Sequence, residues 1–63
     1  MQNRTRHHAI TQAQVYANRN DCPVFIWEIK NTMHETLWFE WYPEHDPQVK
    51  LFESAPDVTI WPA

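Results

Sequence analysis

The sequence predicts a small α+β domain in which one short N-terminal helix packs on an antiparallel β-meander of three to four strands. Two observations carry this prediction. Bulky aromatic and aliphatic residues are concentrated in residues 23–43, where they alternate in the manner of paired strands. A separate alanine-rich segment, residues 9–18, has helical spacing and no internal breaker. The 63 residues allow one domain, which we place at residues 9–63 after a flexible basic tail at residues 1–8.

The alanine-rich segment predicts a helix of about two to three turns. Its alanines recur at a spacing of four, which places them on one stripe: Ala9, Ala13 and Ala17. We expect Thr11 to be the N-cap, with Gln14 three residues later completing a capping box. Because so short a helix is not stable alone in water, it must lie on the sheet, and Val15 and then Tyr16 are the side chains that we expect to be buried there.

Residues 24–30 predict the first strand because β-branched and aromatic residues dominate them. One side of this strand is wholly apolar, and we expect it to pack beneath the helix: Phe25, Trp27 and Ile29. A loop of about three to five residues should follow, since no Asn-Gly dipeptide is present to form a two-residue turn. The chain has no glycine, so a turn position with positive φ must fall to Asn or Asp, and Asn31 is the expected residue.

Residues 34–42 are compatible with either a strand or a helix. The helical interpretation depends on a capping box from Thr32 to Glu35 and on apolar residues at a spacing of four: Met33, Leu37 and Trp41. The strand interpretation depends on period-two alternation and on a majority of strand-favouring residues. We favour the strand, which makes this segment the partner of residues 24–30, and Pro43 ends either element.

The C-terminal third predicts turns and short strands. Prolines bracket a polar turn at residues 43–47, and alternation at residues 49–53 predicts a third strand. Residues 58–61 predict a short edge strand, because Pro56 and Pro62 flank it and proline is tolerated at sheet edges.

Charge divides the chain into a basic start and an acidic body. Residues 1–20 carry three arginines and no acid, whereas residues 21–63 carry two lysines against all eight acids, a net −6. This acidic body suits a cationic protein partner. The alternative is a nucleic-acid-linked regulator, acting by mimicry of nucleic acid or by binding through the basic start, although binding normally needs a more concentrated basic face. The residues available for such binding are Arg4, Arg6, His7, His8 and Arg19.

No catalytic or cofactor-binding constellation is found in the sequence. Phosphate-cradling loops and nucleophile elbows need glycine, which is missing. The metal candidates form two pairs, which the predicted strand holds roughly 30 Å apart: His34 with Glu35, and His45 with Asp46. We therefore expect no metal site, no cofactor and no enzymatic activity.

Composition predicts a cytoplasmic protein that does not enter a membrane. No apolar run approaches the roughly 20 residues that cross a bilayer, and the first residues lack the apolar core of a secretory signal. The single cysteine, Cys22, excludes an internal disulfide and suits a reducing compartment. Without a disulfide or a metal, so small a domain must rely on an efficient aromatic core, a homodimer or both.

The chain carries more aromatic side chains than one helix can cover, because a helix covers a single face of a sheet. It has four Trp, two Tyr and three Phe residues. We expect the surplus, with one acid among it, to form a partner-binding surface: Trp38, Glu40, Tyr42, Phe52 and Trp61. The predicted function is a non-enzymatic protein-binding module, an accessory or inhibitory protein that docks on a larger partner, forms a homodimer, or both. That phages and mobile elements encode many such proteins is background knowledge and no inference from these residues.

Overall fold

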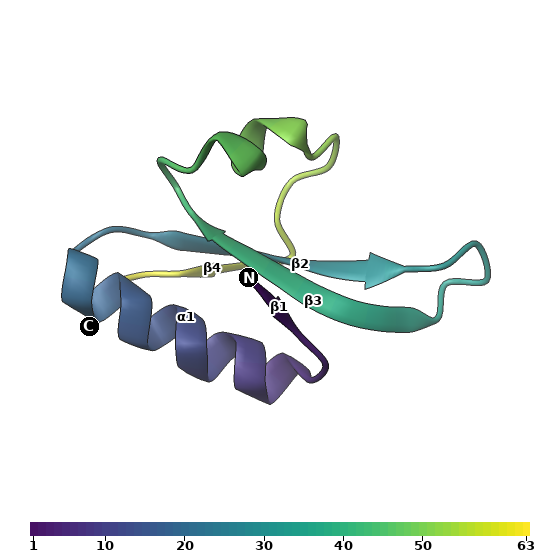
Figure 1. Cartoon of the computed structure of the whole chain (residues 1–63), viewed down its shortest axis with the longest axis horizontal. Helices are drawn as coiled ribbons and strands as arrows, with labels where there is room; N and C mark the ends of the chain where they lie inside the picture. Colours follow the sequence, from purple (N-terminus) through teal and green to yellow (C-terminus); the bar gives the residue numbers. More distant parts are fainter.

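The computed structural model describes residues 1–63 and confirms the predicted fold class, with one helix packed on a four-stranded antiparallel sheet (Figure 1). The elements follow in the order β1 (Gln2–Asn3), α1 (Arg6–Asn20), β2 (Val24–Lys30), β3 (Thr36–Pro43), the 3₁₀ helix η1 (Pro47–Leu51) and β4 (Val58–Ile60). No helix of the chain combines the length and the apolar character needed to cross a bilayer.

The β2–β3 hairpin forms the centre of the sheet, whose strand order is β1-β3-β2-β4. Its register runs from Val24 opposite Pro43 to Lys30 opposite Thr36, with a shift between Ile29 and Lys30. The strand interpretation of residues 34–42 is therefore confirmed over β3. The two edge strands come from the two ends of the chain, since β1 pairs with β3 and β4 pairs with β2. The short edge strand predicted at residues 58–61 is confirmed as β4.

The loop between β2 and β3 has the predicted length, but the residue with positive φ is not the one predicted. The Asn31 Oδ1 atom accepts hydrogen bonds from the backbone N–H groups of Met33 and Glu35, at 2.9 and 3.0 Å. Asn31 thus holds the turn together through its side chain, and the residue with positive φ is His34, at 64°. The prediction that Asn31 has a positive φ is therefore wrong. Asn31 stabilises the turn through hydrogen bonds of its side chain, and His34 adopts the left-handed conformation.

The helix begins five residues earlier than the cap predicted at Thr11. Thr5 is the N-cap, and its side chain accepts a hydrogen bond from the His8 backbone N–H at 3.2 Å. Thr11 lies inside the helix, where its hydroxyl donates to the carbonyl of His7. At the other end, Asp21 adopts φ 50° and its N–H reaches the Ala17 carbonyl. The cap at Thr5 lies six residues before Thr11, so the helix is more than one turn longer at its start than predicted.

Residues 1–8 differ from the expected flexible tail, since they form β1, the N-cap and the first turn of α1. The backbone of Met1 pairs with that of Trp41 through two hydrogen bonds, at 3.1 and 3.4 Å. Gln2 and Asn3 continue this pairing opposite Glu40 and Phe39. The outer edge of β3 would otherwise leave these backbone groups unpaired, which explains why a polar segment without apolar periodicity becomes ordered.

The main core lies between α1 and one face of the sheet. The predicted alanine stripe is fully buried there, and the small side chains let the helix approach the large ones of the sheet. The sheet residues that contact it come from β2, β3 and β4: Val24, Ile26, Phe39, Trp41 and Ile60. Val15 remains 45% exposed, so the expectation that it is buried is wrong. The expectation for Tyr16 holds in part, since Tyr16 is partly buried and packs on this core.

The apolar side of β2 predicted to lie beneath the helix faces the opposite way. Val24 and Ile26 contact the helix, so the alternate residues Phe25 and Trp27 lie on the far face. Trp27 is nevertheless 3% exposed, because a second structural layer covers it. Period-two alternation separates the two sides of a strand, but it does not say which side meets the helix.

The second layer is the segment between β3 and β4, where a third strand was predicted at residues 49–53. This segment forms η1 instead, because Asp46 caps it by accepting from the Gln48 N–H and Pro47 occupies its first position. The ring of Phe52 stacks on Trp27 with centroids 3.9 Å apart and planes at 6°. Figure 1 shows η1 and α1 on opposite sides of the sheet. The far face is therefore covered at Trp27 by a short loop layer, whereas Trp38, Glu40 and Tyr42 on the same face remain half-buried.

Candidate functional site

The first candidate site lies on the face of β3 that points away from α1. Trp38, Glu40 and Tyr42 are alternate residues of this strand and share that face. The Trp38 indole Nε1–H donates to Glu40 Oε2 at 2.8 Å, and the Tyr42 hydroxyl donates to Glu40 Oε1 at 2.7 Å. One carboxylate is thus held by two aromatic side chains on the same strand. We refer to these three residues as the Glu40 clamp.

Hydrogen bonding fixes the charge state of the clamp. The bond from Trp38, followed by that from Tyr42, lowers the pKa of Glu40 below its usual value of 4.5. The same carboxylate raises the pKa of Tyr42 to about 12, with burial and the nearby Asp46 adding to the effect. Near neutral pH the clamp therefore holds an ionised carboxylate and a neutral phenol, and its charge is −1.

Four of the five predicted partner-binding residues lie together. Phe52 joins the Glu40 clamp because its ring centroid is 5.9 Å from that of Tyr42. Trp61 does not join it, since it follows β4, which is two strands away from β3 in the sheet. Its carbonyl accepts a hydrogen bond from Gln14 Nε2 at 2.8 Å, and the residue is 66% exposed. The structure therefore separates the predicted surface into a four-residue group and an isolated exposed tryptophan.

The basic residues of the N-terminal segment do not gather into one patch. Arg6 lies in the first turn of α1 and Arg19 in the last, which puts about 20 Å of helix between them. His34 and His45, which belong to the two candidate metal pairs, flank β3 at opposite ends. No group of three or more His, Cys, Asp or Glu side chains is arranged to hold a metal ion.

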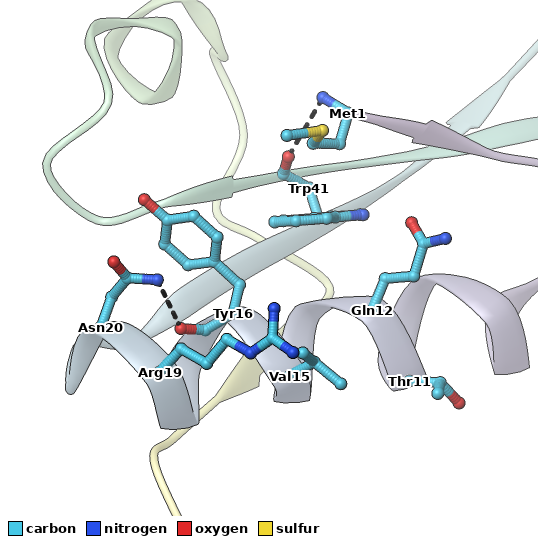
Figure 2. A pocket seen from close by; sticks show the side chains of 8 residues that line it. All are labelled: Met1, Thr11, Gln12, Val15, Tyr16, Arg19, Asn20 and Trp41. Atoms are coloured by element: carbon cyan, nitrogen blue, oxygen red, sulfur yellow. Dashed lines mark hydrogen bonds between the residues drawn. The ribbon is translucent and has the colours of Figure 1, made fainter.

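A second candidate site, which the sequence does not reveal, is an open groove between α1 and the β1–β3 edge (Figure 2). Its volume is about 520 Å³. We refer to it as the helix–strand groove, and its walls include Met1, Gln12, Val15, Tyr16, Arg19 and Trp41.

A short hydrogen-bond network orders one wall of this groove. Trp41 Nε1 donates to Asn3 Oδ1 at 2.9 Å, and Asn3 Nδ2 donates to Gln12 Oε1 at 3.2 Å. Tyr16 packs against Trp41 with ring centroids 5.8 Å apart and planes at 60°. The spacing of Tyr16 and Arg19 within the helix is visible in the sequence. The pairing of Met1 with Trp41 cannot be predicted from the sequence, because a polar segment carries no pattern that indicates which strand it will pair with.

Comparisons with protein-family models, with curated proteins and with solved structures find no match for this chain. The functional conclusion therefore depends on the chemistry of these two surfaces.

Proposed function

We propose that the chain is a small non-enzymatic protein-binding module, an accessory or regulatory protein that docks on a larger protein through the Glu40 clamp and Phe52. The partner segment it receives is cationic. The observation that carries the proposal is the carboxylate of Glu40, ionised, held between two aromatic side chains and bound to no Lys or Arg side chain. The N-terminal ammonium is near enough to help lower the pKa of Glu40, but it forms no hydrogen bond to the carboxylate.

The clamp has the chemistry that a guanidinium or ammonium group needs. Each oxygen of Glu40 accepts one hydrogen bond from within the chain and has capacity for another. A cation placed there gains charge-assisted hydrogen bonds to Glu40 and lies next to the side chains of Trp38 and Tyr42. The two existing bonds fix the carboxylate in advance, which lowers the ordering cost of binding. Trp and Tyr are also residue types that dominate the energetics of protein interfaces.

Long-range charge supports the same partner. Residues 21–63, which build the sheet and the loop layer, carry a net −6. Asp46 lies close enough to the clamp to raise the pKa of Tyr42. A cationic partner is therefore attracted before contact, whereas a second acidic clamp is repelled.

The test uses an arginine peptide, acetyl-Gly-Arg-Gly-Arg-Gly-amide, and its neutral analogue with citrulline in place of arginine. Binding is followed by NMR of the Trp38 indole N–H. We expect Glu40→Gln to weaken arginine-peptide binding by at least about tenfold, since it removes the charge and keeps the shape. The matched control is Glu53→Gln, which makes the same change of net charge at an exposed acid outside the clamp.

Three results would contradict the proposal. Equal weakening by Glu40→Gln and Glu53→Gln would mean that only diffuse acidity attracts the peptide. Equal binding of the citrulline peptide would remove the role of the cation. Failure of the Trp38 resonance to move at millimolar peptide would remove the site itself.

A homodimer is the second candidate role, and the exposed Trp61 favours it. A tryptophan that is 66% exposed in a domain this small is a ready contact for another apolar surface. If Trp61 mediates self-association, the solution mass of the wild-type chain should exceed that of one copy and fall in Trp61→Ser. A wild-type mass equal to one copy across the micromolar range would exclude this role.

A further inference from the structure

We propose that the helix–strand groove is a binding site for a small aromatic monocarboxylate. The groove and the Glu40 clamp lie on opposite sides of the sheet, because Trp41 faces α1 while Glu40 and Tyr42 face away. The two sites carry opposite charge, so their ligands differ in chemistry.

The size of the groove fits a ligand of one or two rings. Its volume of about 520 Å³ lies within the roughly 300–1,000 Å³ of small-molecule pockets. Figure 2 shows the Trp41 and Tyr16 rings on the inner side, with Met1 above them and Val15 on the helix below. Met1 and Val15 are 63% and 45% exposed, so apolar wall is available that no other part of the chain covers.

The walls favour an aromatic ligand over an aliphatic one. Trp41 is 4% exposed and forms the floor of the groove, while the half-buried Tyr16, tilted at 60° to it, offers the accessible ring against which an aromatic ligand can pack. Met1 is unbranched and flexible, and its sulfur can adapt to the edge of a bound ring. Val15 supplies the opposing wall from the helix.

The polar groups at the rim favour a carboxylate. The only ionisable side chains among the lining residues belong to Tyr16 and Arg19, and no acid is present. Figure 2 shows the Arg19 side chain extending from α1 toward the space between Tyr16 and Val15. The Gln12 amide oxygen is engaged by Asn3, which leaves the Gln12 amide N–H groups as donors at the same rim. The guanidinium of Arg19 at the edge of an apolar hollow matches one carboxylate attached to a ring, and the Gln12 amide lies about two helix turns away along the same wall.

The cationic rim of the groove contrasts with the acidic remainder of the chain. The chain has a net charge of −3, and residues 1–20, from which nearly all the lining comes, hold no acid. An anion is therefore repelled by the sheet and loop layer and is accepted at the groove.

The experiment compares indole-3-acetate with indole-3-acetamide, which has the same ring and no charge. The chain should carry no added residues before Met1, because this residue lines the groove. Affinities come from isothermal titration, and NMR of the tryptophan indole N–H signals locates the ligand. We expect the acetate to bind about tenfold more tightly than the amide, and the Trp41 signal to move while that of Trp27 stays fixed.

Two arginine variants separate recognition at the groove from general attraction. Arg19→Gln should abolish the preference for the acetate, whereas Arg6→Gln, which makes the same charge change at an exposed residue in the first turn of the helix, should retain it. Arg19→Lys should restore part of the preference because the charge returns without the planar fork. Equal affinity for the two compounds in the wild-type chain would overturn the proposal. An unmoved Trp41 signal at millimolar acetate, or equal effects of the Arg19 and Arg6 changes, would overturn it as well. None of these outcomes bears on the arginine peptide or on the Glu40 clamp.

Discussion

Replacing Trp27 by alanine tests whether the loop layer is a true second core. Trp27 is 3% exposed, although it lies on the face of the sheet that α1 does not cover. Phe52 stacks on it at 3.9 Å, and Phe25 meets it edge-on at 6.1 Å. Its indole Nε1–H also donates to the carbonyl of Ser54 at 3.0 Å. One side chain therefore holds the segment between β3 and β4 by both stacking and a hydrogen bond.

The expected loss of stability is large compared with what a chain of this size possesses. Truncating a buried Trp to alanine costs about 3–5 kcal/mol, including the cavity that it leaves. Within this total, the stacked pair contributes about 0.5–1.5 kcal/mol and the hydrogen bond to Ser54 about 0.5–1.5 kcal/mol. A 63-residue domain has a total stability of about 3–9 kcal/mol, at roughly 0.05–0.15 kcal/mol per residue. Trp27→Ala should therefore be unfolded or only marginally folded at 25 °C.

Urea unfolding followed by far-ultraviolet circular dichroism gives the measurement. Trp61→Ala is the matched control, since it removes the same side chain from a site that is 66% exposed and should cost less than about 0.5 kcal/mol. Trp27→Phe keeps a ring for Phe52 and loses the bond to Ser54, so we expect an intermediate cost of about 1–2 kcal/mol. A Trp27→Ala midpoint close to that of Trp61→Ala would refute the existence of the second core.

Four further predictions concern the helix ends and the clamp. Thr5→Ala should cost about 0.5–2 kcal/mol by removing the N-cap, whereas Thr11→Ala should be neutral or slightly stabilising within the helix; equal effects in thermal unfolding would contradict the assignment of the cap. Asp21→Gly should stabilise the chain by about 0.5–1 kcal/mol, because glycine adopts φ 50° without strain; a lower melting temperature would contradict this. Absorbance at 295 nm should show Tyr42 ionising near pH 12, and in Glu40→Gln its pKa should return toward 10.0. The folded state holds the Tyr42 proton more tightly than the unfolded state, so stability should fall as pH rises from about 10 to about 12. It holds the Glu40 proton less tightly, so stability should also fall as pH drops below 4.5. Urea midpoints that do not change with pH in either window would contradict these shifts.

The hairpin and the helix can be predicted because their signals are local. Residues 24–30 are rich in β-branched and aromatic side chains, and they are a strand to the residue. The alanines at a spacing of four share one side of α1, and the structure buries that side, whereas the expected burial of Val15 is wrong. Polar Asn31 and its neighbours mark the loop, even though His34 takes the left-handed position. Each of these features depends on residues that are only a few positions apart in the sequence.

The features that could not be predicted depend on contacts distant in the sequence. The pairing of Met1 with Trp41 spans 40 positions, and the stacking of Phe52 on Trp27 depends on how a long connection folds back. The stretch at residues 49–53 alternates as a strand does, but Pro47 and the Asp46 cap start a 3₁₀ turn there. The sequence names the three clamp residues as part of a five-residue surface, but the hydrogen bonds to Glu40 and the separation of Trp61 are visible only in the structure.

Both candidate sites depend on the register of one strand. Trp41 and Tyr42 are neighbours on β3, yet Trp41 belongs to the groove and Tyr42 to the clamp, because successive side chains point to opposite faces. Sliding β3 by one residue along β2 would exchange the two faces and destroy both sites together. The register is fixed at one end by the Asn31 turn and at the other by the pairing of Met1 with Trp41. The N-terminal pairing therefore does more than close a sheet edge: it holds Trp41 over the helix, and in doing so it keeps Glu40 and its two aromatic partners on the opposite face.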